Sequence, residues 1–313
     1  MSDSQSQWVS RAITGKKLIY LEAALGVILG ASFIIFGWYV LAIAALSIGL
    51  SVGVDFVFAK GRKQKIDESW LVFPLLYALM LPPSAPLWMA GVGVVFGNLF
   101  AKQLFGGYGK TIFHPAAVGI MFLMISFPAI IFGWYDPEVY GWFNPFSQAS
   151  LDALAPVMPL HEINASGSTN YVFSDLIMGF VPGNIGETFG LLLLVLGSAL
   201  MVLKVIDWRL PTSILVSYLV TAGIFELFGA TGGTIPSMFT GTLLFGAFFI
   251  ASDPVHSPVN AKAIWIYGAG VAFITFIIRY FATFAEGFVF AVIIMSALGA
   301  LIDAWITSKE EPA

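Results

Sequence analysis

The chain has 313 residues, of which 58% are hydrophobic and 10% are charged, and its formal net charge is −4. A soluble domain carries about 25% charged residues, so this chain has too little polar surface to cover a globule in water and is predicted to be an integral membrane protein. It contains no cysteine and three histidines, which excludes disulfides, thiolate zinc sites and cysteine-ligated iron–sulfur clusters and disfavours a bis-histidine haem in this chain.

Ten apolar stretches approach the length of about 20 residues that a helix needs to cross a bilayer. A polar, basic segment precedes the first stretch, and no small-residue cleavage site closes a short hydrophobic region, so we predict a first membrane helix and not a signal peptide. The third and eighth stretches are short and run into prolines, which predicts broken or partial helices. The predicted spans are residues 18–36, 38–59, 69–82, 84–102, 112–132, 186–204, 211–228, 237–252, 262–279 and 286–306.

The positions of the basic residues support this span count. If the N-terminus is cytoplasmic, thirteen of the fourteen Lys and Arg residues fall on inner segments, and only Arg279 falls outside. Inner loops of membrane proteins collect Lys and Arg, so we predict that both termini are cytoplasmic. The segment 133–185 contains five carboxylates and no Lys or Arg and is expected on the extracytoplasmic side.

Two parts of the chain repeat one order of features. The third predicted span ends at Pro82 and Pro83, the eighth ends at Asp253 and Pro254, and each is followed by a tryptophan and a Gly-Val helix. Each copy is third and fourth in a set of five spans, and sets of five insert with opposite orientation, which predicts an all-α inverted repeat whose broken helices expose backbone groups. The predicted units are a first five-helix repeat (1–132), an extracytoplasmic loop (133–185) and a second repeat (186–313).

Asp253 and a glycine-rich loop are the first candidate site residues. A carboxylate at membrane depth is costly unless it is paired, hydrated or functional. Asp253 is therefore either a helix-terminal acid in interfacial water, with Pro254 ending the helix, or a group that lines an ion or electron-transfer site. Gly106, Gly107 and Gly109 form either a tight loop or a bare backbone that a flavin or quinone ring approaches closely.

Three further candidates stand near predicted helix starts. His114, followed by Pro115, either caps a helix or contacts a cofactor or relays protons, because imidazole can hold either charge state near neutral pH. Glu187 opens the sixth predicted span, where the helix dipole favours an acid but where a flavin or cation contact is the alternative. Asn260 completes the candidate cofactor contacts, and His256 is assigned to a loop.

Three motifs resemble the RnfD/NqrB family of membrane subunits from ion-translocating Rnf and Na⁺-translocating Nqr electron-transport complexes. They are "AKQLFGGYGKTIFHPAAVGIMFLMISFP" (101–128), "VPGNIGET" (181–188) and "GAFFIASDPVHSPVNAKAIWIYG" (246–268). The match runs in order from about residue 18 to 306. The lack of a long N-terminal extension makes the chain more similar to RnfD than to NqrB.

The resemblance implies an electron-carrying subunit in the inner membrane of a prokaryote. It implies a bound flavin (FMN or riboflavin), partner subunits that carry iron–sulfur clusters and further flavin, and electron passage coupled to Na⁺ or H⁺ movement. Quinone is another candidate ligand. We expect no iron–sulfur cluster, haem or other metal site in this chain and no nucleic-acid partner.

The chain departs from the family at the covalent flavin site. The family pattern D-G-[LI]-S-x-A-T-P-L carries FMN on its threonine, whereas residues 152–160 read "DALAPVMPL", with Met158 at the threonine position. A thioether cannot form a phosphoester, so any flavin is expected to be non-covalent, with Thr169 as an alternative anchor. His114 also stands where the family has Asn. If no flavin is retained, the chain serves as an ion-conducting or scaffolding element, and a stand-alone channel or transporter is the competing class.

Overall fold

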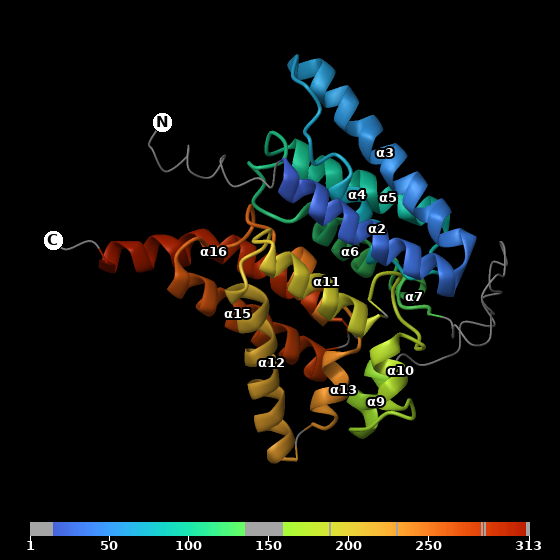
Figure 1. Ribbon diagram of the computed structural model, residues 1–313, viewed down its shortest axis with the longest axis vertical. Helices are drawn as coiled ribbons and strands as arrows, with labels where there is room; N and C mark the ends of the chain where they lie inside the picture. The colour runs from blue at the N-terminus through green and yellow to red at the C-terminus, as the bar shows by residue number, and fades with distance from the viewer. Residues whose placement is uncertain are drawn as a thin grey trace.

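A computed structural model describes residues 15–134, 159–187, 189–229, 231–282, 284 and 286–310. Within these ranges the chain forms helices and no strand (Figure 1). Five helices are long and apolar enough to cross a membrane, namely α2 (Lys16–Phe36), α3 (Trp38–Arg62), α12 (Arg209–Leu227), α15 (Ala261–Phe281) and α16 (Phe288–Glu310). The helical, multi-pass membrane character predicted from composition is confirmed.

Shorter helical elements connect and separate these five. They are α4 (Val72–Leu79), α5 (Leu87–Gly97), η1 (Asn98–Gln103), α6 (Pro115–Ser126), α7 (Pro128–Ile131), α9 (Pro159–Ser166), α10 (Phe173–Met178), α11 (Gly190–Val202), α13 (Thr234–Met238), α14 (Leu243–Phe245) and η3 (Gly246–Ile250). A helix overlaps each of the ten predicted ranges. The inverted five-plus-five repeat stays a prediction, because half of these helices are shorter than a membrane span.

The third and eighth predicted spans are short, as the prolines indicated. Every residue of α4 is buried, and so is every residue of α14 and η3. Proline has no N–H to donate and blocks the continuation of a helix, and the chain leaves helical structure before Pro82 in the first case and before Pro254 in the second. Both interrupted segments therefore lie inside the protein.

The helices form two groups that follow the order of the chain (Figure 1). In the first group α3 contacts α2, α4 and α5, and α5 contacts α6; in the second, α15 packs between α12 and α16. The groups meet where α6 contacts α16 and where α2 contacts α11. Residues far apart in sequence are therefore neighbours along the boundary between the groups.

The segment before α11 inserts into this boundary. The N–H groups of Ile185 and Gly186 donate to the carbonyls of Leu81 and Leu79, at 2.9 and 2.7 Å. A Cβ on Gly186 would lie 2.8 Å from Leu79 Cβ and 3.3 Å from the Phe245 ring, so only glycine fits between α4 and α14. These hydrogen bonds supply donors to carbonyls that have no partner within the helix at the end of α4.

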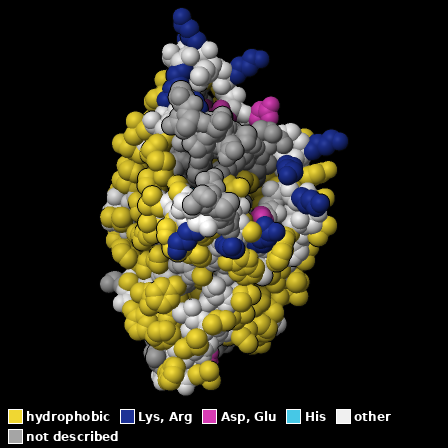
Figure 2. Space-filling model, turned by 90° about the vertical axis from the view of Figure 1, so that its left-hand side faces the viewer, with side chains coloured by type: hydrophobic (Ala, Val, Ile, Leu, Met, Phe, Trp, Pro, Cys, Tyr) yellow, Lys and Arg dark blue, Asp and Glu magenta, His cyan; other side chains and the backbone are white. Residues whose placement is uncertain are grey.

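The charged surface is unevenly distributed. Figure 2 shows Lys and Arg side chains gathered on the face in view, with hydrophobic side chains covering the sides below and around them. Hydrophobic flanks beside a face that carries basic residues are the kind of surface that a bilayer selects. The small helices α9 and α10 lie at the far end of the molecule from the turn that follows α3 (Figure 1).

Candidate functional site

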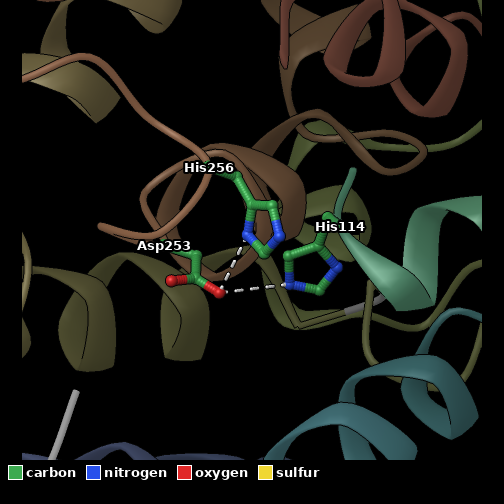
Figure 3. Close-up of side chains that lie close together, drawn as sticks. All are labelled: His114, Asp253 and His256. Atoms are coloured by element: carbon green, nitrogen blue, oxygen red, sulfur yellow. Dashed lines mark hydrogen bonds and ion pairs between the residues drawn. The ribbon is translucent and has the colours of Figure 1, made fainter. Parts of the chain in front are cut away.

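Two histidines and an aspartate meet at the boundary between the helix groups. Asp253 and His256 lie in the turn that follows η3, whereas His114 directly precedes α6. Pro115 begins α6, where a missing N–H costs nothing. His114 occupies the N-cap position, but its side chain makes no capping hydrogen bond. The side chain instead faces the turn of the other helix group (Figure 3).

The three side chains form a compact cluster, here called the His–Asp cluster (His114, Asp253 and His256). The Asp253 Oδ2 atom lies 3.2 Å from His256 Nδ1 and 3.8 Å from His114 Nε2. The two imidazole rings are 5.0 Å apart and inclined at 57°. All three side chains are buried, with exposed fractions of 2%, 8% and 4%. This arrangement can hold a cation or a proton between two helix groups.

Neighbouring groups stabilise the carboxylate of this cluster. The Tyr108 hydroxyl donates to Asp253 Oδ1 at 3.1 Å, and the Val255 N–H donates to the same oxygen at 3.0 Å. A buried carboxylate needs such partners, because it loses its water on burial. Asp253 is therefore not the interfacial, water-exposed acid of the simpler interpretation.

The glycine-rich loop positions Tyr108. Gly106, Gly107 and Gly109 have φ values of 102°, 104° and 89°, a region that residues with a Cβ rarely adopt. The tight-loop interpretation thus accounts for all three glycines. Gly109 also lines, together with His256, a pocket of about 220 Å³. Contact of these glycines with a flavin or quinone stays a prediction.

Asn260 has a structural explanation. Its side-chain oxygen accepts the Lys262 N–H at 2.8 Å and so caps α15, while its own N–H donates to Asp303 Oδ1 at 3.0 Å. Such a cap accepts a hydrogen bond from one of the N–H groups at a helix start that have no partner within the helix. Pro254 follows Asp253 in the turn and is partly buried. A cofactor contact at either residue stays a prediction.

A second buried cluster, the Glu–Arg cluster (Glu187, Arg279 and Glu286), lies at another point of the boundary. Arg279 Nη2 lies 3.4 Å from Glu286 Oε2, and neither side chain is more than 1% exposed. The Thr242 N–H donates to Glu286 and its hydroxyl donates to Glu187, at 3.2 and 2.6 Å. Asn184 also donates to Glu187, at 2.8 Å.

The position of Glu187 differs from its prediction. The helix α11 begins at Gly190, so Glu187 is not in a helical first turn and the helix-dipole explanation is wrong. The residue instead belongs to the segment that bonds to the end of α4. Its Oε2 atom is buried and has no hydrogen-bond partner among the described residues. Two carboxyl groups and one guanidinium thus share this buried cluster.

A third buried cluster, the Lys–Asp cluster (Asp55, Asn98, Lys102 and Gln103), joins α3 to η1. Lys102 Nζ lies 2.7 Å from Asp55 Oδ2, while Asn98 and Gln103 donate to Oδ1 at 3.0 and 2.7 Å. The π-helical turn η1 carries all three of these Asp55 partners. Such turns occur often at functional sites because they redirect side chains.

Met158, the residue at the family's covalent flavin position, lies outside the described residues. The alternative anchor Thr169 is described, and its hydroxyl donates to Glu162 Oε2 at 2.8 Å. Burial would raise the pKa of Glu162, but the Asn170 N–H and the Thr169 hydroxyl donate to its carboxylate and lower that pKa overall. Attachment of flavin to Thr169 stays a prediction.

Sequence reasoning missed the partnership of His256 with His114. The two residues are separated by more than 140 positions, and each stands in a non-helical segment. A local signal did exist, because "DPVH" places an imidazole three residues after a carboxylate across a proline turn. Asp55 and Glu286 were likewise not assigned to a site.

The NQR2, RnfD, RnfE family model matches residues 2–311. In Actinobacillus succinogenes, a component of the ion-translocating oxidoreductase complex is 31% identical, with 86% of each chain covered. A component of the Na(+)-translocating NADH-quinone reductase is 29% identical in Yersinia pestis and 30% identical in Pseudomonas paraeruginosa. The match covers 80% of this chain but spans only 62% and 63% of those two relatives. The resemblance seen in the three motifs is therefore confirmed, and the chain belongs to the NQR2, RnfD, RnfE family.

Proposed function

We propose that this chain is the membrane subunit of an Rnf/Nqr-like ion-translocating electron-transport complex and forms part of its ion pathway. The observation that carries the proposal is the family match over residues 2–311. The buried charged clusters between the helix groups support it, because ionisable residues inside a membrane protein mark ion and proton routes. The coupled ion is Na⁺ or H⁺.

The proposed setting is the inner membrane of a prokaryote, with the basic face of Figure 2 in the cytoplasm together with both termini. We assign the two helix groups to two proposed five-helix repeats, 1–132 and 186–313, with a proposed extracytoplasmic loop, 133–185, between them. Partner subunits supply the iron–sulfur clusters and further flavin, and quinone is a proposed electron acceptor for the assembly. In this arrangement the interrupted segments α4 and η3 both lie inside the bilayer.

The pocket beside the glycine loop is smaller than a typical cofactor pocket. The pocket beside Gly109 and His256 has a volume of about 220 Å³, below the roughly 300–1,000 Å³ of typical cofactor pockets. The thioether of Met158 also excludes the phosphoester of the family pattern. Any flavin beside this pocket is therefore proposed to be held without a covalent bond at position 158 and to contact surfaces beyond the pocket as well.

Flavin content and partners test the proposal together. Affinity purification from native membranes is expected to recover flavin- and iron-containing partner subunits, while the denatured chain itself shows no flavin fluorescence on a gel. The variant Met158→Thr is expected to gain a fluorescent band in a host that attaches FMN to family members. A colourless preparation without partners would contradict the proposal and favour a stand-alone channel. A fluorescent wild-type band that maps to Thr169 would overturn the assignment of Met158.

Replacement of Glu187 tests the ion pathway. Glu187→Gln is expected to lower Na⁺ or H⁺ uptake by the reconstituted complex without lowering its stability. The amide keeps the Oε1 acceptor for Thr242 and Asn184, and it removes the repulsion from the second carboxylate of the Glu–Arg cluster. Ion uptake into proteoliposomes during electron transfer is the measurement. Glu162→Gln, on α9 outside the clusters, is the matched control, and equal uptake by both variants would refute the role of Glu187.

A further inference from the structure

We propose that the His–Asp cluster is a binding site for a divalent transition-metal ion of the zinc or ferrous class. This inference goes beyond the proposed function and departs from the sequence-based expectation that the chain has no metal site. His114, Asp253 and His256 each offer one ligand atom, and these three atoms lie within 4.8 Å of one another. Two imidazoles and one carboxylate are a ligand set that such metals accept.

The distances from Asp253 Oδ2 to the two imidazoles are compatible with a shared metal ion. Ligands at about 2.0–2.1 Å from a tetrahedral ion are separated from one another by roughly 3.3–3.4 Å. The separations from Asp253 Oδ2 to the two imidazole nitrogens are 3.2 and 3.8 Å, which bracket that value. The longer of the two exceeds a hydrogen bond, so a shared ion explains why His114 stands there.

The environment of His114 leads to the same conclusion. Its side chain is only 2% exposed, yet its Nδ1 atom has no hydrogen-bond partner among the described residues. A buried imidazole without such bonds loses its hydration without replacement. Coordination of an ion through Nε2, the atom that faces Asp253 (Figure 3), would give this buried imidazole one strong polar contact, while Nδ1 stays without a partner among the described residues.

The other two ligands are oriented as metal ligands usually are. A ligating histidine generally bonds a neighbour through its second nitrogen, and a ligating carboxylate is itself hydrogen-bonded. The His256 Nε2 atom lies 2.8 Å from the Thr111 hydroxyl. Asp253 Oδ1 accepts from Tyr108 and Val255, which leaves Oδ2 directed at the imidazoles. Thr111 and Tyr108 are thus positioning residues.

Charge and space also permit an ion. Lys102 lines the small pocket on the His114 side of the cluster, but its ammonium group forms an ion pair with Asp55 at 2.7 Å. On the other side, the pocket of about 220 Å³ borders His256. This volume exceeds the roughly 30 Å³ that one water occupies, so it leaves room beside His256 for a water as fourth ligand.

Metal content of the purified, intact complex tests the proposal. After treatment with chelator, addition of Zn²⁺ or Co²⁺ and desalting, mass spectrometry is expected to find one ion per chain. The Co²⁺ form is expected to show visible absorption bands, and Zn²⁺ is expected to raise the midpoint of thermal unfolding. His256→Gln is expected to abolish all three signals, and Thr111→Val, which removes only a positioning hydroxyl, to weaken metal affinity about 10–100-fold.

A matched control separates this site from adventitious binding. His161→Gln removes the one histidine that is not part of the cluster and lies on α9. This variant is expected to leave the signals intact. His114→Asn gives a second ligand deletion in case His256→Gln fails to fold. Wild-type protein that retains no metal after desalting, or retention that is equal in the ligand variants and the control, would overturn the proposal.

Discussion

Arg279→Gln is expected to destabilise the folded chain by about 3–5 kcal/mol, the usual cost of leaving a buried charge without its partner. Arg279 is 1% exposed and forms an ion pair with Glu286, which is fully buried. Its guanidinium also donates to the carbonyls of Ser237 and Thr240, at 2.9 and 3.2 Å. The substitution leaves the Glu286 carboxylate without its cation. Denaturant titration of the protein in detergent micelles measures the loss.

Two further variants show whether the loss comes from charge. Arg279→Gln combined with Glu286→Gln is expected to recover part of the stability, because the carboxylate that lost its cation is then neutral as well. Arg209→Gln is the matched control, since Arg209 lies 3.8 Å from Asp207 in a pair that is 40% and 44% exposed. Such a pair is worth about 0–1 kcal/mol. A loss at Arg279 no larger than the loss at Arg209 would contradict the buried-pair interpretation.

Lys102→Met is expected to have an effect of similar size, about 3–5 kcal/mol. The ammonium group of Lys102 is 2.7 Å from Asp55 Oδ2, and the side chains are 1% and 4% exposed. Asn98 and Gln103 still donate to Oδ1 in the variant, but neutral donors do not balance the charge of a buried carboxylate. The midpoint of unfolding in detergent is again the measurement.

The matching double variant identifies the cause of this second effect. Lys102→Met with Asp55→Asn is expected to be more stable than Lys102→Met alone, because the amide needs no cation. Lys60→Met is the control, since Lys60 lies in the last turn of α3 and is exposed. If the double variant is no more stable than the single one, the Lys102 side chain acts through packing and not through its charge.

The three buried clusters share one structural cause. Each cluster contains a residue from a segment that is not regular α-helix. Lys102 lies in the π-helical turn η1, Asp253 in the turn after η3, and Glu187 in the segment before α11. Inside a membrane protein, non-helical backbone persists only where protein or an internal cavity surrounds it. The buried non-helical segments therefore also place polar side chains in the protein interior.

Local composition alone determined the class of this protein and the approximate position of its helices. Hydropathy over about 20 residues and the positions of prolines are properties of short segments, so the apolar stretches and the interrupted third and eighth spans were predictable. The family was predictable for a similar reason, since its motifs are contiguous. The positive φ values of Gly106, Gly107 and Gly109 are also a local property, and the tight-loop interpretation anticipated them.

Only the tertiary structure decided which charged residues become partners. Asp55 joins Lys102 across 47 positions, Tyr108 reaches Asp253 across 145, and Thr242 reaches Glu187 across 55. No periodicity links such residues, because each pair depends on how separate helices pack against each other. Burial then makes these pairings obligatory, since an ionised group without water is stable only beside a partner. For that reason the start of α11 at Gly190 and the meeting of His114 with His256 emerged from packing and not from the sequence.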